Sequence, residues 1–152
     1  MCFTKIKDTI KKEETLPPVP KPTPTLRREI VMADLYNLLH EKFPDAHIRL
    51  SDIVTQLCDI RDINAFLAID ETNRIKYQKE DVDCDDFAFM LLGQFSTPPW
   101  SAFAFGFIWT DQHAMNICVD ANLEIWLIEP QTDVVKSNLE SWQGTKVIEL
   151  FL

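Results

Sequence analysis

Hydrophobic positions in the first half of the chain recur at the spacing of one helical face. Between residues 26 and 43 they return every three or four residues, and the run ends at Phe43, which precedes a proline. This spacing predicts a helix over residues 26–43. A similar run extends from Asp62 to Ile69 and predicts a second helix with Asp62 as its N-cap.

The second half of the chain is dominated by aromatic and β-branched residues in short runs separated by polar breaks. These runs cover residues 101–110, 113–120, 123–129 and 146–152. Runs of this length and composition are typical of strands. A shorter alternating stretch occupies residues 47–50. The pattern therefore predicts an α+β fold in which N-terminal helices pack on a C-terminal antiparallel sheet. Trp100, Trp109 and Trp126 are expected to fill the core.

A cysteine begins the third predicted helix. The hydrophobic positions of residues 84–95 follow a helical spacing, and Asp85 and Asp86 occupy the first turn, where acidic side chains are favourable. Cys84 then lies at the helix N-terminus, where unsatisfied backbone N–H groups favour a thiolate. Cys84 is therefore the candidate nucleophile.

The polar break at residues 120–123 predicts a tight hairpin between two strands. If the turn is centred near residue 121, position 113 faces 129 or 130, and facing residues have Cβ atoms about 5 Å apart. His113 and Glu129 then become neighbours. A histidine can take a thiol proton and return it to a leaving group, while a carboxylate orients its ring. The sequence predicts Cys84, His113 and Glu129 as a catalytic triad.

Four aspartates surround the candidate nucleophile and disfavour a thiolate. They are Asp81, Asp83, Asp85 and Asp86. A hard cation such as Ca²⁺, bound by these carboxylates, would remove that penalty and make activity metal-dependent. The spacing is not that of an EF-hand, so a solvated acidic helix start is the alternative.

The net charge and the spacing of the cysteines limit the classes of partner that we expect for this chain. The net charge of −9 repels phosphate backbones, so nucleic acid is not expected as a partner. The four cysteines form no CxxC pair, and the start of the chain lacks the apolar core of a secretory signal. No apolar run reaches the roughly 20 residues that cross a bilayer. We expect reduced thiols, no membrane partner and a location in the cytoplasm of the producing cell.

The first 25 residues differ in composition from the rest of the chain. They are rich in Lys, Glu, Thr and Pro, and the prolines concentrate in residues 17–24. Such a stretch favours extended polyproline II over a helix. Residues 1–25 are therefore predicted to be a disordered leader or a tether to a larger assembly, and residues 26–152 to be the catalytic domain.

Three short motifs carry a resemblance to a known family. They are Tyr77 followed by Asp83-Cys84-Asp85-Asp86-Phe87-Ala88, then His113-Ala114-Met115-Asn116, then Trp126-Leu127-Ile128-Glu129-Pro130-Gln131-Thr132-Asp133. In this order they resemble the papain-like cysteine protease domain of the Marasmius oreades agglutinin family, over residues 46–152. The resemblance implies a papain-like fold, peptide-bond hydrolysis and calcium dependence. The lectin domain of that family has no counterpart here, and stand-alone members look like phage or prophage proteins, which implies a place in a phage particle.

The resulting prediction is a cysteine peptidase that acts on a protein or peptide substrate. The backbone N–H of Cys84 is the expected oxyanion donor, with the side chain of Gln131 as an addition. Two alternatives stay open. A transglutaminase-like enzyme or cell-wall amidase shares the triad chemistry, and a non-catalytic virion or binding module keeps the fold without turnover.

Overall fold

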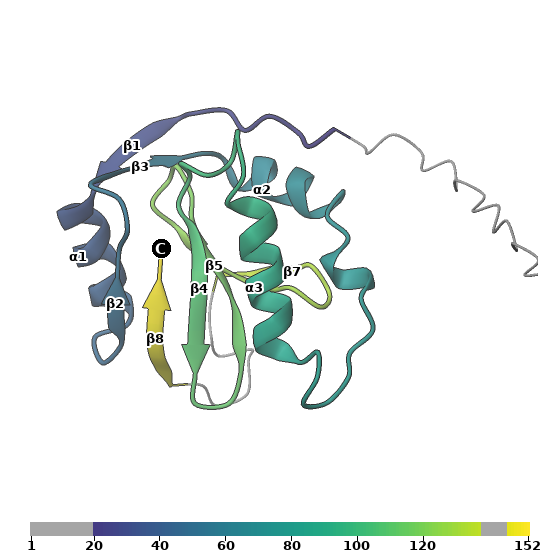
Figure 1. Cartoon of the computed structure of the whole chain (residues 1–152). Coiled ribbons are helices and arrows are strands. Elements are labelled where there is room, and N and C mark those ends of the chain that lie inside the picture. The colour runs from purple at the N-terminus through teal and green to yellow at the C-terminus, as the bar shows by residue number, and fades with distance from the viewer. Residues whose placement is uncertain (1–19, 138–145) are drawn as a thin grey trace, which may run out of the picture.

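The computed structural model describes residues 20–137 and 146–152 of the chain and combines helices with two sheets (Figure 1). The helices are α1 (Met32–Lys42), α2 (Ile60–Leu67) and α3 (Cys84–Phe95), with a 3₁₀ turn η1 (Thr72–Arg74) between the last two. The strands are β1 (Arg28–Val31), β2 (His47–Arg49), β3 (Val54–Leu57), β4 (Phe105–Thr110), β5 (Ala114–Val119), β6 (Ile125–Glu129), β7 (Val134–Lys136) and β8 (Val147–Phe151). The predicted α+β class is confirmed.

The larger sheet has six strands in the order β2-β8-β4-β5-β6-β7, and β1 and β3 form a separate two-stranded sheet. Within the six-stranded sheet, neighbouring strands pair antiparallel, except that β2 and β8 run parallel. The four runs predicted as one antiparallel sheet, β4, β5, β6 and β8, do pair antiparallel; the parallel pair involves β2, which the sequence had not placed in this sheet. In Figure 1 the C-terminal strand β8 lies between β2 and β4, so segments about 100 residues apart in sequence pair directly.

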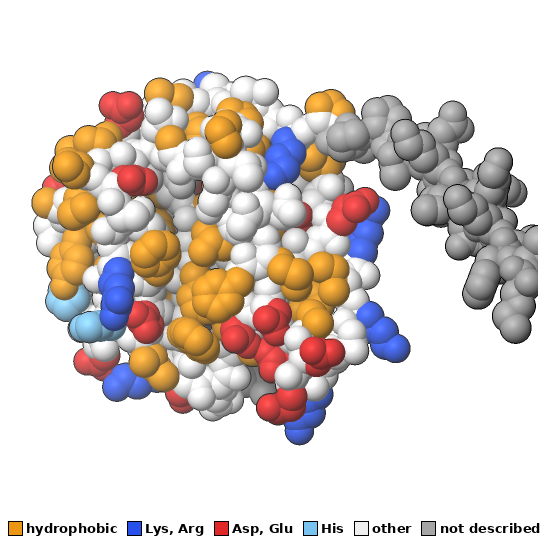
Figure 2. Space-filling model, in the orientation of Figure 1, with side chains coloured by type: hydrophobic (Ala, Val, Ile, Leu, Met, Phe, Trp, Pro, Cys, Tyr) orange, Lys and Arg blue, Asp and Glu red, His pale blue; other side chains and the backbone are white. Residues whose placement is uncertain are grey.

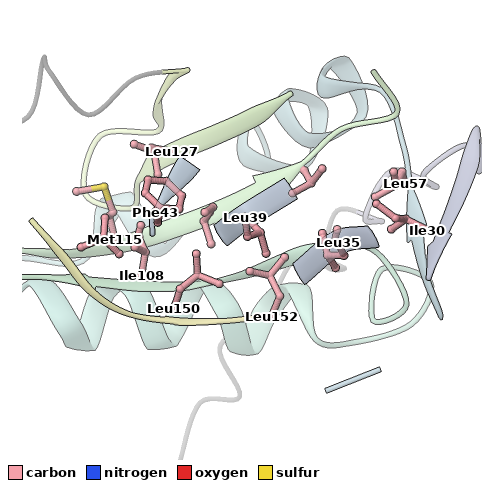
Figure 3. Packing of buried hydrophobic residues seen from close by; sticks show 14 residues of the cluster. Ile30, Leu35, Leu39, Phe43, Leu57, Ile108, Met115, Leu127, Leu150 and Leu152 are labelled. Atoms are coloured by element: carbon pink, nitrogen blue, oxygen red, sulfur yellow. The ribbon is translucent and has the colours of Figure 1, made fainter. Parts of the chain in front are cut away.

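The two faces of the large sheet each have their own core. On one face, Leu35 and Leu39 of α1 pack with Ile108, Met115 and Leu150, as Figure 3 shows. On the other face, α2 and α3 enclose a cluster of aromatic side chains. Its members include Phe66, Phe95, Trp100, Phe103 and Phe105. The helices therefore cover opposite sides of one sheet, which fixes the start of α3 against β4 and β5.

The observed helix starts correct two predictions. Residues 28–31 pair with β3 instead of extending α1, so the first helix begins at Met32. The N-cap of α2 is Asp59, whose carboxylate accepts from the backbone N–H of Arg61 at 2.9 Å. Asp62 is not the cap. It lies in the first turn, and its Oδ2 accepts from the backbone N–H of Thr25 at 3.1 Å.

The predicted leader is described only in its last residues. Residues 1–19 lie outside the described part, while residues 20–25 contact the domain through backbone and side-chain hydrogen bonds. Within the described residues, no helix is long and apolar enough to cross a membrane.

Candidate functional site

The start of α3 places Cys84 at the edge of a small buried cluster. Asp83 is the N-cap residue, and its backbone N–H donates to Oδ2 of Asp86 at 3.1 Å. Cys84 is half-buried and packs against the cluster formed by Ala88, Phe107 and Ala114. The capping residues therefore determine where α3 begins. Packing against β4 and β5 holds Cys84 on the side of the helix that faces the sheet.

His113 and Glu129 are in direct contact. Nε2 of His113 lies 2.6 Å from Oε2 of Glu129, whose side chain is buried among β5, β6 and their loops. The backbone of His113 is held by the Thr110 hydroxyl, which accepts from its N–H at 2.8 Å and donates to its carbonyl at 2.7 Å. The structure thus brings together two of the three predicted residues.

The third predicted residue, Cys84, lies at the same end of β5. Its packing partner Ala114 directly follows His113 in the chain. Cys84 therefore packs beside the start of β5, next to the residue that follows His113. Cys58 and Cys118 are buried, and burial raises the pKa of the Cys58 thiol to about 12 and that of Cys118 well above its usual value.

Gln131 contacts Glu129 through its backbone. Its N–H donates to Oε1 of Glu129 at 3.3 Å. This contact helps to orient the carboxylate, and it assigns no oxyanion role to the Gln131 side chain.

The predicted calcium ligands are brought together only in part. Ligand atoms of Asp83, Cys84 and Asp85 all lie within 4.8 Å of one another. A hydrogen bond with Asp83 raises the pKa of Asp85, and desolvation adds to this. Asp86 accepts from the helix start, and Asp81 is not in the group. Since Ca²⁺ takes six to eight oxygen ligands, two carboxylates form an incomplete set.

Sequence reasoning missed an exposed group of aromatic side chains beside this end of α3. Phe89, Trp109 and Phe151 are 50%, 41% and 44% exposed. They surround the buried Phe107, which stacks on Phe89 with ring centroids 4.5 Å apart and meets Trp109 edge to face at 5.2 Å. We call Phe89, Phe107, Trp109 and Phe151 the aromatic platform.

Strand register explains the aromatic platform. Phe107 faces Phe151 and Trp109 faces Glu149 across β4 and β8, so these side chains share one face of the sheet. In Figure 1, α3 lies to one side of β4 and β8, and no helix covers this face of the two strands. The signal in the sequence was the alternation at residues 105, 107 and 109, although only the pairing with β8 shows that its end is uncovered.

Charged groups border the aromatic platform. Glu149 pairs with Arg49 at 3.1 Å. On the other side, Asp85 lies one helical turn before Phe89, on the same face of α3. Figure 2 shows hydrophobic side chains on this face with acidic side chains gathered beside them. The surface therefore combines flat apolar area with carboxylate acceptors.

Comparison with known proteins gives a fold but no family. No model of a protein family matches the sequence, and no curated protein sequence matches it. Solved structures that share the fold include the following two. The structure titled "PSL1a-E64 complex" has a TM-score of 0.70 and 20% sequence identity, and it covers 82% of this chain and 51% of that chain.

A second structure is a Polyporus squamosus lectin bound to the human-type influenza-binding epitope Neu5Aca2-6Galb1-4GlcNAc. Its TM-score is 0.68 with 18% identity, and it covers 82% of this chain and 49% of that chain. The chain thus spans about half the length of these neighbours. The predicted relationship to lectin-associated proteins is confirmed at the level of the fold.

The same neighbours contradict the predicted function. The second neighbour is described as a lectin bound to a glycan, which favours a binding role over the predicted hydrolase. The prediction of a cysteine peptidase with a peptide substrate is therefore corrected in favour of a binding module, the alternative that the sequence had left open.

Proposed function

We propose that this chain is a carbohydrate-binding module and that the aromatic platform is its sugar-binding surface. The single observation that carries the proposal is the exposure of Phe89, Trp109 and Phe151 as one group next to carboxylates. Exposed aromatic groups rimmed by polar residues mark ligand sites. The lectin among the structural neighbours, which is bound to a glycan, supports the same class of ligand.

The chemistry of a sugar matches this surface. A pyranose presents an apolar C–H face that can lie flat on an aromatic ring, and hydroxyls around its edge that donate to carboxylates. Trp109 supplies the largest exposed ring, and Glu149 faces it across the strand pair. Asp85 supplies a second acceptor from the α3 side. Stacking thus provides contact area, and the carboxylates provide orientation.

A glycan panel tests the proposal on the full-length chain. Neu5Aca2-6Galb1-4GlcNAc, the epitope bound by one neighbour, is one probe, beside neutral oligosaccharides. We expect retention of at least one glycan, and loss of that retention in Trp109→Ala. Retention of no glycan, or equal retention by the variant, would contradict the proposal.

A second candidate function is acyl transfer from a side-chain amide, the transglutaminase-like alternative. The contact of 2.6 Å between His113 and Glu129 favours it, with Cys84 at the same end of β5. His113 would take the Cys84 thiol proton as the sulfur adds to the amide carbonyl, and the C–N bond would break as His113 gives that proton to the leaving ammonia. An acceptor amine or water would then resolve the thioester.

The assay for this candidate follows a glutamine-containing peptide and a labelled primary amine. Incorporation that disappears in Cys84→Ser supports the candidate, and no incorporation contradicts it. E64, with which one neighbour is titled as a complex, is a second probe whose retention is compared between the wild type and Cys84→Ser.

A papain-like fold and calcium dependence are predictions that accompany this second candidate. A place in a phage particle also stays a prediction. Because Asp83 and Asp85 form an incomplete oxygen set, calcium needs a direct test. Calorimetric titration of the chain with CaCl₂, compared with Asp85→Asn, provides it. Heat that is lost in the variant would support a site at α3.

A further inference from the structure

Residues 20–25 run past the C-terminal end of α3 and the N-terminal end of α2 (Figure 1). Their sequence, Pro-Lys-Pro-Thr-Pro-Thr, has a proline at every second position and favours polyproline II. The indole N–H of Trp100 donates to the carbonyl oxygen of Pro22 at 2.8 Å. A hydrogen bond from an aromatic side chain to a carbonyl oxygen of a proline-rich segment is a recurring feature of polyproline recognition.

Lys21 makes the densest set of contacts in this segment. Its ammonium donates to the backbone oxygen of Gln94 at 2.6 Å and to the Thr97 hydroxyl at 3.0 Å. It also lies 5.3 Å from the ring centroid of Phe66. The Gln94 oxygen belongs to the last turn of α3, where the helix dipole favours a cation. The site therefore selects a positive charge as well as a carbonyl.

The far end of the segment is fixed separately. The backbone N–H of Thr25 donates to Oδ2 of Asp62 in the first turn of α2. Beyond Lys21 the surface continues into a cavity of about 740 Å³ between α2, η1 and α3, with Phe66 and Gln94 in its lining. Three independent contacts thus hold six residues of extended chain, and the surface is hollowed at the Lys21 end of the segment.

We infer that this surface is a recognition groove for a proline-rich segment with a lysine before Pro-x-Pro, filled in cis by residues 20–25. We call it the leader groove and define it by its contacting residues. They are Asp62, Phe66, Gln94, Thr97 and Trp100. The leader groove thus holds residues 20–25 between the C-terminal end of α3 and the first turn of α2.

Hydrogen exchange at the Trp100 indole tests occupancy in the full-length chain. The resonance is assigned with Trp100→Phe. We expect Lys21→Glu, which turns the ammonium into a carboxylate facing the helix C-terminus, to speed exchange at least tenfold. Lys76→Glu is the matched control, because Lys76 is exposed and carries the same charge change; its exchange should equal that of the wild type.

A peptide in trans tests recognition. A fluorescent peptide of residues 18–27 competes in the wild type with the attached segment, whose effective concentration is on the order of millimolar. We therefore expect it to bind full-length Lys21→Glu at least tenfold more tightly than the wild type, and the same peptide carrying Lys21→Glu to bind neither. Equal binding to both proteins, no binding to either, or unchanged indole exchange in Lys21→Glu would overturn the inference. Peptide binding that tracks dimer formation would overturn the cis assignment in favour of a second copy.

Discussion

His113 and Glu129 touch along a diagonal, not directly across their hairpin. The register pairs Asn116 with Ile128, so by counting, position 113 faces 131, two residues beyond Glu129 on the same face. The contact of 2.6 Å therefore arises where the strands end, and not within the ladder. The predicted neighbours are correct, although the turn is centred on Asn122 and not near residue 121.

The reactivity of Cys84 should depend on this diagonal pair. In a Cys2→Ser background, iodoacetamide should label Cys84 well before the buried Cys58 and Cys118. His113→Ala should slow labelling of Cys84 at least tenfold, because the base that takes the thiol proton is removed. Peptide mass mapping of the labelled chain measures the three rates.

Glu129→Gln is the more selective variant in that experiment. It keeps the shape of the side chain while removing the carboxylate that orients the ring, so a slowing of several-fold is expected. His47→Ala is the matched control, since His47 is an exposed histidine at the other side of the sheet. If Cys84 reacts at the same rate in all four proteins, the three residues do not act as a unit.

Truncation of Trp109 in the aromatic platform should remove sugar binding and leave the fold intact. Trp109→Ala is expected to raise the Kd of any bound glycan at least tenfold. The cost in stability should stay near 1 kcal/mol, because the indole is partly exposed and its main ring contacts are with Phe107 and Phe89. Calorimetric titration and urea unfolding measure the two effects.

Tyr36→Ala is the matched control for that substitution. Tyr36 is an aromatic residue of similar exposure on α1, where it stacks on His40. Glycan affinity should be unchanged in this variant. An equal loss in both variants would show that the effect of Trp109→Ala is not specific to the aromatic platform.

The elements that the sequence predicted well are those whose signals are local. The limits of α3 match the prediction, because acidic residues at its start and a continuous helical spacing reinforce one another. The start of α1 was missed, because residues 28–31 pair with β3 about 25 residues later. Nothing in the local spacing reports such a pairing.

The prediction of the hairpin register was wrong for a different reason. The Asp120 carboxylate accepts from the backbone N–H groups of Asn122 and Glu124 at 2.9 and 3.0 Å, and from the Trp126 indole at 3.1 Å. Leu123 adopts a φ of 65°. These contacts lengthen the turn and move its centre to Asn122. A left-handed leucine is not expected from turn preferences, so counting alone could not place the centre.

The exposed aromatic platform could not be predicted because it depends on the order of strands. Trp109 was expected in the core, and its alternation with Phe107 supports that expectation. Its exposure follows from the pairing of β4 with β8, which puts this part of the sheet beyond the cover of α3. Functional surfaces are where such local expectations often fail.

Protonation of Asp133 should stabilise the fold as the pH is lowered. Desolvation, with repulsion from Asp70, raises the pKa of Asp133 from 3.8 to about 6, and the carboxylate accepts from the side-chain amide of Asn73. A folded pKa above the unfolded one means that the ionised form costs stability. That cost is full above about pH 6, shrinks as the pH falls from 6 to 3.8, and is absent below.

Asp133→Asn isolates this contribution. The amide keeps an oxygen for Asn73 and tolerates the positive φ of 56° at this position. The variant should unfold at a higher temperature than the wild type at pH 7.5, and the difference should narrow towards pH 4. Thermal unfolding across this range measures it. A difference that is constant with pH would show that Asp133 does not titrate in this window.

The two glycines at 93 and 106 should respond in opposite directions to alanine. At Gly106 in β4, an added Cβ would lie against the backbone oxygen of Phe151 and 2.8 Å from Cγ of Leu152. The backbone of β8 cannot yield without breaking its pairing with β4, so Gly106→Ala should cost about 2–3 kcal/mol. At Gly93 in α3 nothing lies within 4 Å of the added Cβ, and Gly93→Ala should stabilise by about 0.5–1 kcal/mol. Urea unfolding of both variants beside the wild type measures the pair. A neutral Gly106→Ala would mean that β8 does not approach β4 as closely as the structure has it, which would also remove the support for Phe151 in the aromatic platform.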